Sequence, residues 1–112
     1  MGKRNDPRKR FLSGYLEAER RLSLKREKST IAEEAPAIRI EAAHLLERRA
    51  VVLAAIESAP EPIMRTILEA RYINGLKWED IARMTGYSVD NAFKIHQKAL
   101  RQMNFPDYAS KG

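Results

Sequence analysis

Near the C-terminal end of this sequence, six polar side chains recur at helical spacing. They are Asp90, Asn91, Lys94, Gln97, Lys98 and Arg101. The apolar residues between them are Ala92, Ile95, Ala99 and Met103. Steps of three and four put each set on its own face of an α-helix, polar outward and apolar inward. Amide groups can read base edges and cations can bind phosphates, so the outward face carries residue types that could contact DNA. We call this stretch the reading helix.

A shorter helical pattern precedes the reading helix and ends at a glycine. Its apolar stripe consists of Trp78, Ile81 and Ala82. Gly86 can take the left-handed conformation that ends a helix, which costs other residues roughly 1 kcal/mol. Ser88 can then accept a hydrogen bond from a free backbone N–H of the next helix, as its N-cap. Two helices joined in this way are typical of a helix-turn-helix.

The residues around this turn are expected to form a small core. Ala82 and Ala92 are small at the point where two steeply crossing helices must approach closely. Ile81, Tyr87 and Ile95 are expected to close the core around them. We therefore predict that the two helices cross in close contact.

These residues resemble a known family of DNA-reading domains, the C-terminal domain (region 4) of sigma factors. The similar run is Gly86-Tyr87-Ser88-Val89-Asp90-Asn91-Ala92-Phe93-Lys94-Ile95, continued by His96-Gln97-Lys98-Ala99-Leu100-Arg101. The upstream run from Arg71-Tyr72 to Trp78-Glu79-Asp80-Ile81-Ala82 narrows the resemblance to small phage and prophage regulators of the ArpU and RinA type. Those regulators join such a domain to an N-terminal helical hairpin. The close match covers about a third of the chain.

The resemblance implies a sequence-specific DNA-binding transcriptional regulator that activates late genes. Double-stranded DNA is then the expected partner, and RNA polymerase is a second candidate. The expected DNA-binding residues are Ser88, Val89, Asp90, Asn91, Phe93, Lys94, Gln97, Lys98 and Arg101. A recognition helix meets base edges with its N-terminal residues, so those from Val89 to Lys94 are candidates for base readout. Phe93 is a candidate for a thymine methyl, and Gln97, Lys98 and Arg101 for phosphates.

The chain departs from the sigma pattern at two positions. Val89 and Phe93 stand where sigma factors usually carry a base-reading Arg or Gln. A sigma-type promoter sequence is therefore not implied. Phe93, if exposed, is also a candidate for contact with another protein.

Positive charge is concentrated at the N-terminal end. The formal net charge is +6 at pH 7; residues 1–28 hold ten Lys or Arg against four acids, and residues 77–112 hold six against four. Residues 1–10 include the run Arg8-Lys9-Arg10, and we expect Pro7 to keep this segment out of a long helix, as a flexible basic arm. Two interpretations stay open for the arm, a contact with DNA phosphates or a solubilising tail.

The segment after the arm is predicted to be an amphipathic helix over residues 11–28. Its apolar seam is narrow, with Leu12, Tyr15 and Leu22 at helical spacing. A helix with so thin a seam is not stable alone in water and needs a partner.

The partner is expected to be a longer helix over residues 37–58. This element is apolar almost all round from Val51 to Ile56, which indicates burial on more than one side. We expect a helical hairpin over residues 11–59, with a connection at residues 29–36, and a homodimer formed by the apolar surface left over. Alternatively, the C-terminal helices cover that surface.

Residues 60–112 are predicted to form the helix-turn-helix domain. A proline can occupy the first position of a support helix over residues 62–72, with Asn74-Gly75 as its terminator. In the tail, Phe105 and Tyr108 are expected to fold back on the domain.

The chain as a whole is predicted to be all-α, and its composition argues against several function classes. Its 112 residues include no cysteine, and His44 and His96 stand singly, so no metal site and no cofactor is expected. There is no Gly-rich phosphate loop and no nucleophile with a base at a recognisable spacing, so we expect no enzyme and no catalytic residue. No apolar run approaches a membrane span and the basic start lacks the apolar stretch of a signal peptide, so we expect the bacterial cytoplasm and no membrane partner.

A second class of function stays open, an interaction or assembly module that uses the helix-turn-helix for protein contact. One form is a small DNA-recognition subunit of a phage packaging machine, which assembles into a ring. Another is a sigma mimic that binds polymerase without reading DNA. Size in solution separates them, because a dimer favours the regulator, a large ring the packaging subunit and a monomer the mimic.

Overall fold

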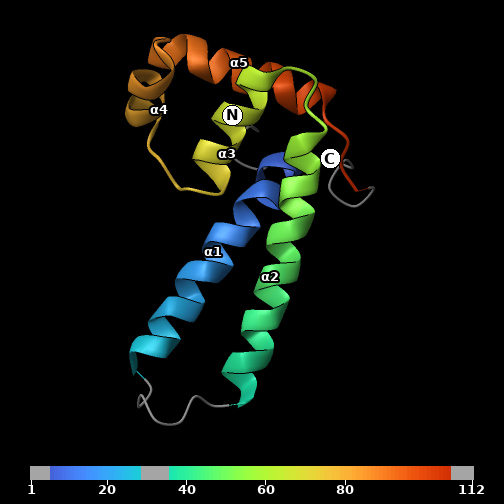
Figure 1. Cartoon of the computed structure of the whole chain (residues 1–112), viewed down its shortest axis with the longest axis vertical. Coiled ribbons are helices and arrows are strands. Elements are labelled where there is room, and N and C mark those ends of the chain that lie inside the picture. Colours follow the sequence, from blue (N-terminus) through green and yellow to red (C-terminus); the bar gives the residue numbers. More distant parts are fainter. Residues whose placement is uncertain (1–5, 29–35, 107–112) are drawn as a thin grey trace.

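The computed structural model describes residues 6–28 and 36–106 of the chain. Its regular elements are α1 (Pro7–Lys28), α2 (Pro36–Glu57), α3 (Pro62–Tyr72), α4 (Trp78–Thr85) and α5 (Val89–Gln102). No strand occurs in the described part, and the prediction of an all-α protein is confirmed there. The molecule measures 47 × 33 × 28 Å, with α1 and α2 along its length and the other three helices at one end (Figure 1).

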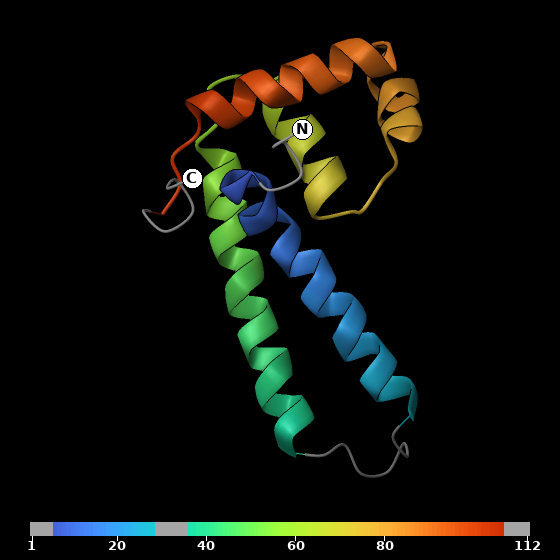
Figure 2. The same cartoon turned by 180° about the vertical axis from the view of Figure 1, so that it is seen from behind.

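The two long helices lie side by side and run in opposite directions (Figures 1 and 2). Leu22 from α1 and Ile38 from α2 are buried, and Lys25 Nζ lies 2.9 Å from a carboxylate oxygen of Glu41. The seam between the helices is as narrow as the sequence predicts. Because α1 covers only one side of α2, Ile40 and Leu46 on the other side remain 59% and 70% exposed.

The main core lies where the pair of long helices meets α3 and α5. It is built from buried residues of four helices and of the segments that follow them, among them Leu12, Val52, Ile56, Met64, Leu68, Leu100 and Met103. The long helices alone cannot bury these side chains. The packing of α3 and α5 therefore depends on this end of the pair of long helices, and the pair is stabilised by them in turn.

A second, smaller core joins α3, α4 and α5. Ile67, Ala70, Ile81 and Ala92 are its buried members. Gly86, with φ of 82°, ends α4 in the left-handed conformation, where a side chain is strongly disfavoured. The Ser88 hydroxyl accepts a hydrogen bond of 3.1 Å from the backbone N–H of Asn91 and so caps α5. Tyr87, however, is 41% exposed, so its expected place in this core is wrong.

The first helix begins earlier than expected. Pro7 occupies its first position, where a proline has no hydrogen bond to lose, and the Asp6 carboxylate accepts a hydrogen bond of 2.8 Å from the backbone N–H of Arg8. The expectation that Pro7 excludes this segment from the helix is therefore wrong. Residues 1–5 of the predicted arm and residues 29–35 of the predicted connection lie outside the described part.

The end of the described chain folds back as expected. The Phe105 ring packs edge-on against Phe11, with 5.9 Å between the ring centroids. Tyr108, for which the same was expected, lies outside the described residues. The C-terminal end of the described chain therefore lies against the beginning of α1.

Replacing Leu12 by alanine should destabilise the whole fold, because Leu12 is 0% exposed in the main core. Large-to-small core substitutions of this kind cost about 2–5 kcal/mol. Leu24→Ala, in the same helix but 57% exposed, is the matched control and should change stability by about 0.5 kcal/mol or less. Urea unfolding followed by circular dichroism measures both. Equal losses for the two variants would contradict the assignment of the core.

Candidate nucleic-acid interface

The outward face of α5 carries most of the side chains that the sequence predicts to contact DNA. The exposed residues on it are Asp90, Asn91, Lys94, Lys98 and Arg101. Ser88 and Val89 are exposed at the start of the helix, and the Val89 side chain remains 41% exposed. The face opposite, with Ala92 and Ala99 fully buried, is fixed against the other helices.

One ion pair lies on this outward face. Lys94 Nζ is 3.1 Å from a carboxylate oxygen of Asp90, one helical turn earlier, and both side chains are well exposed. An exposed pair of this kind contributes little stability, because water screens it and ordering two side chains costs entropy. Lys94 can therefore exchange Asp90 for a phosphate or a base edge at little cost.

Two of the predicted contact residues lie on the flank of α5 instead. Phe93 is half-buried, with its ring centroid 5.2 Å from that of Trp78. The Lys9 ammonium lies 5.0 Å from the Phe93 centroid, on the side that faces α1. Gln97, one turn further on, is also half-buried. This placement does not support the expected contact between Phe93 and a thymine methyl, and we leave Phe93 out of the contacts proposed below.

A buried polar pair lies behind Phe93. The Tyr72 hydroxyl and His96 Nε2 are 2.7 Å apart, and His96 is 1% exposed. Burial lowers the pKa of His96 to about 3, and the nearby cations Lys9 and Arg71 act in the same direction. Burial also raises the pKa of Tyr72. Both groups are therefore uncharged at neutral pH, and their hydrogen bond joins α3 to α5.

The sequence carries a signal for this buried histidine, although His96 is not among the predicted core residues. His96 follows Ala92 by four residues and precedes Ala99 by three, so it belongs to the inward stripe of α5. The same spacing shows why His96 is buried while the polar residues next to it are not.

The first turn of α1 lies against α5, which no sequence pattern indicated. The Arg8 guanidinium donates a hydrogen bond of 3.3 Å to the backbone oxygen of Leu100 and forms an ion pair of 3.2 Å with Asp6. An open hollow of about 230 Å³ lies between the two helices. Its lining residues are Asp6, Arg8, Lys9, Gln97, Leu100 and Arg101. Basic residues from the two ends of the chain thus lie together.

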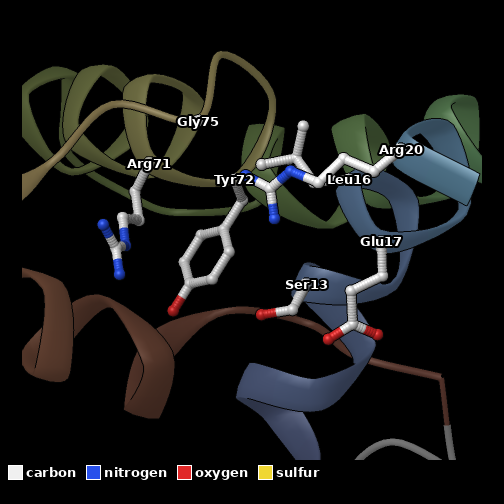
Figure 3. A pocket seen from close by; sticks show the side chains of 7 residues that line it. All are labelled: Ser13, Leu16, Glu17, Arg20, Arg71, Tyr72 and Gly75. Carbon is white, nitrogen blue, oxygen red and sulfur yellow. The ribbon is translucent and has the colours of Figure 1, made fainter. Parts of the chain in front are cut away.

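A second hollow, of about 160 Å³, separates α1 from the end of α3 (Figure 3). Figure 3 shows the hydroxyl of Ser13 from α1 and that of Tyr72 from α3 in it. Arg71, beside them, donates a hydrogen bond of 2.9 Å to the backbone oxygen of Leu76 and lies 5.1 Å from the centre of the Trp78 ring. Arg71 therefore supports the segment between α3 and α4.

The described residues hold no group of three or more His, Cys, Asp or Glu that could bind a metal ion. None of the described helices is both long and apolar enough to span a membrane. The chain matches no family model, no curated protein and no solved structure. Its function is therefore inferred from the residues themselves.

Acid should destabilise this protein through His96. Because its pKa is about 3 in the folded state against 6.5 for a free histidine, the unfolded chain binds the extra proton first as the pH falls. Stability is therefore complete above about pH 6.5 and should fall by roughly 2 kcal/mol between pH 6.5 and 5. Urea unfolding of the wild type at both values measures the loss.

The control for this prediction uses the other histidine. His44 is exposed, so a His44→Gln variant should lose as much stability at pH 5 as the wild type does. The stability of a His96→Phe variant should not fall between pH 6.5 and 5, whatever its value at pH 7. The same acid-induced loss in both variants would contradict the assignment to His96.

Proposed function

We propose that this protein is a sequence-specific DNA-binding transcriptional regulator of the phage or prophage type, an activator of late genes. In this proposal α3, α4 and α5 form a helix-turn-helix of the sigma region 4 kind, and α1 and α2 form the accompanying hairpin. One observation carries the proposal, the exposed polar face of α5. It begins at the capped turn of Ser88 and continues through Asn91, Lys94 and Lys98 to Arg101.

The proposed mechanism assigns different tasks to the two halves of α5. In the major groove, the residues of the first turns, Val89, Asp90, Asn91 and Lys94, meet the base edges. The Asn91 amide can donate a hydrogen bond to N7 of adenine and accept one from its N6 amino group, and so selects adenine. Lys98 and Arg101, further along the same face, bind phosphates and set the register without reading sequence.

A homodimer completes this proposal. On the outward side of α2, the apolar side chains of Ile40 and Leu46 lie exposed near the small residues Ala43, Ala50 and Ala54. Small residues let a second copy of α2 approach closely. Arg39 and Glu57 lie on one side of this face at opposite ends of the helix. In an antiparallel pair related by a two-fold axis, each Arg39 would face the partner's Glu57, which favours a second copy as the occupant.

One observation favours the second candidate function, a module that binds polymerase or another protein. Met84, Tyr87 and Val89, around the turn between α4 and α5, are 52%, 41% and 41% exposed. Exposed apolar side chains in one place are typical of a protein contact. Selection from a random duplex DNA library tests the two functions directly, because a reader of DNA enriches a motif and a protein-binding module does not.

Replacing Asn91 by alanine should weaken binding by about 1–3 kcal/mol on the selected site only, because a bidentate base contact discriminates by that amount. Fluorescence anisotropy with the selected duplex and a scrambled duplex measures both affinities. Gln102→Ala, which removes an exposed amide at the far end of α5, is the control and should leave both unchanged. If Asn91→Ala lowers the affinity for both duplexes equally, base readout by this residue is refuted.

Replacing Leu46 by glutamate should convert the dimer to a monomer, because each copy would bury a charge in the apolar contact. Sedimentation should then give the mass of one chain, 12.9 kDa, in place of twice that value. The control is Leu24→Glu, a similarly exposed leucine of α1, which should leave the dimer intact. A wild-type protein that is monomeric at high concentration would exclude this part of the proposal.

A further inference from the structure

The basic side chains that line the hollow between α1 and α5 come from opposite ends of the chain. Arg8 and Lys9 belong to the first turn of α1, and Arg101 to the last turn of α5. Three cations thus lie around one open hollow, with Asp6 as the single acid that lines it. Such an excess of positive charge favours an anion.

We propose that Arg8, Lys9 and Arg101, with the Gln97 amide, form a clamp for the DNA backbone beside the groove that α5 reads. The clamp rests on the proposed function and adds a second helix, α1, to the binding surface. The ligands are neighbouring phosphates of one strand of the duplex, contacted on the flank of α5.

The position of the hollow relative to the reading face supports this assignment. Phe93, Gln97 and Leu100 follow one another at steps of four and three, so they form a stripe along α5. This stripe lies next to the outward stripe of Lys94 and Arg101. When a helix lies in the major groove, the two phosphate backbones run along its two flanks. The first turn of α1 lies on one flank of α5, where one of these backbones would pass.

The side chains of the clamp are preorganised by contacts within the protein. Arg8 is fixed by its hydrogen bonds to Leu100 and Asp6, yet one third of its side chain is exposed. Lys9 is held over the Phe93 ring, at 5.0 Å from its centre. Side chains that are already ordered lose less entropy on binding than free ones. The two residues can therefore contribute more per contact than cations on a flexible arm.

Asp6 opposes the clamp and provides an unusual test. Burial raises the pKa of its carboxyl, but the hydrogen bonds and the charge of Arg8 outweigh this effect and hold the pKa below its usual value. The acid therefore stays ionised and weakens the attraction for phosphate. An asparagine caps a helix about as well as an aspartate, so Asp6→Asn removes the charge and keeps the start of α1.

The experiment measures DNA affinity over a range of salt concentrations, with the full chain and a duplex containing the selected site. Each phosphate contact contributes about 0.9 to the slope of log K against log salt. Arg8→Gln and Lys9→Gln should each lower the slope by about 0.9 and weaken binding roughly eightfold at 0.1 M salt, with the curves meeting near 1 M. Asp6→Asn should instead tighten binding several-fold.

Two controls separate the clamp from effects on charge or folding in general. Arg21→Gln removes the same charge from an exposed position further along α1 and should leave the slope unchanged. Arg8→Lys keeps the charge but loses the fork of the guanidinium, and should keep the wild-type slope. Thermal unfolding of every variant shows whether the fold is intact.

The outcomes distinguish the clamp from the proposed function. If the wild type binds its site and Arg8→Gln and Lys9→Gln keep its slope, the clamp is refuted and DNA reading by α5 stands. If Arg8→Lys lowers the slope as much as Arg8→Gln does, the clamp is also refuted. The lower slope would then come from a shift of α1 and not from the loss of a charge that binds phosphate. If the wild type binds no duplex DNA, the proposed function fails and the clamp with it.

Discussion

Burial of apolar side chains at one end of the long helices holds this molecule together. Leu12, Ile56, Met64 and Leu68, from α1, α2 and α3, are almost completely buried there, and Leu100 of α5 joins them. Each such side chain contributes about 1.5–3 kcal/mol when it leaves water. The narrow apolar seam along the rest of α1 and α2 buries fewer such side chains and therefore contributes far less stability. The shared core therefore decides how α5 is turned, and with it which residues of α5 face outward.

Within this apolar environment, one polar pair connects α3 to α5. A buried hydroxyl or ring nitrogen without a partner would cost about 1–3 kcal/mol, and the hydrogen bond between the Tyr72 hydroxyl and His96 Nε2 removes this penalty for these two atoms. Since the bond forms only when the two helices lie at the right separation, it favours one arrangement over others of similar apolar burial. Trp78 and Phe93 pack around the histidine ring and extend this arrangement to α4 and to the flank of α5.

The distribution of charge looks different in space from its distribution along the chain. In the sequence the excess of basic residues lies in residues 1–28, far from α5, whose surrounding residues 77–112 are only mildly basic. Folding brings Arg8 and Lys9 to the flank of α5, beside Arg101. The flank of α5 therefore gains positive charge from a segment that the sequence places far from it. Under the proposed function, this added positive charge favours the binding of a polyanion such as DNA.

The sequence by itself determined the local structure. Periodicity, Pro62, Gly86 and Ser88 predicted where helices begin and end, because propensity, capping and the glycine conformation act within a few residues. It also separated the two faces of α5, since a period of 3.6 residues assigns most of the inward and outward positions. The start of α1 was the exception, because a proline that breaks a helix interior is favoured at its first position.

Only the tertiary structure decided which helix covers which face. Tyr87 was expected inside and is exposed, and Phe93 was expected on the reading face and lies on the flank beside Lys9. These positions depend on where α1 and α4 pack, and the contact between Arg8 and Leu100 spans 92 residues of chain. No local pattern encodes such a contact. It follows from burying one shared core, and that is the physical reason why the basic start of the chain lies beside α5.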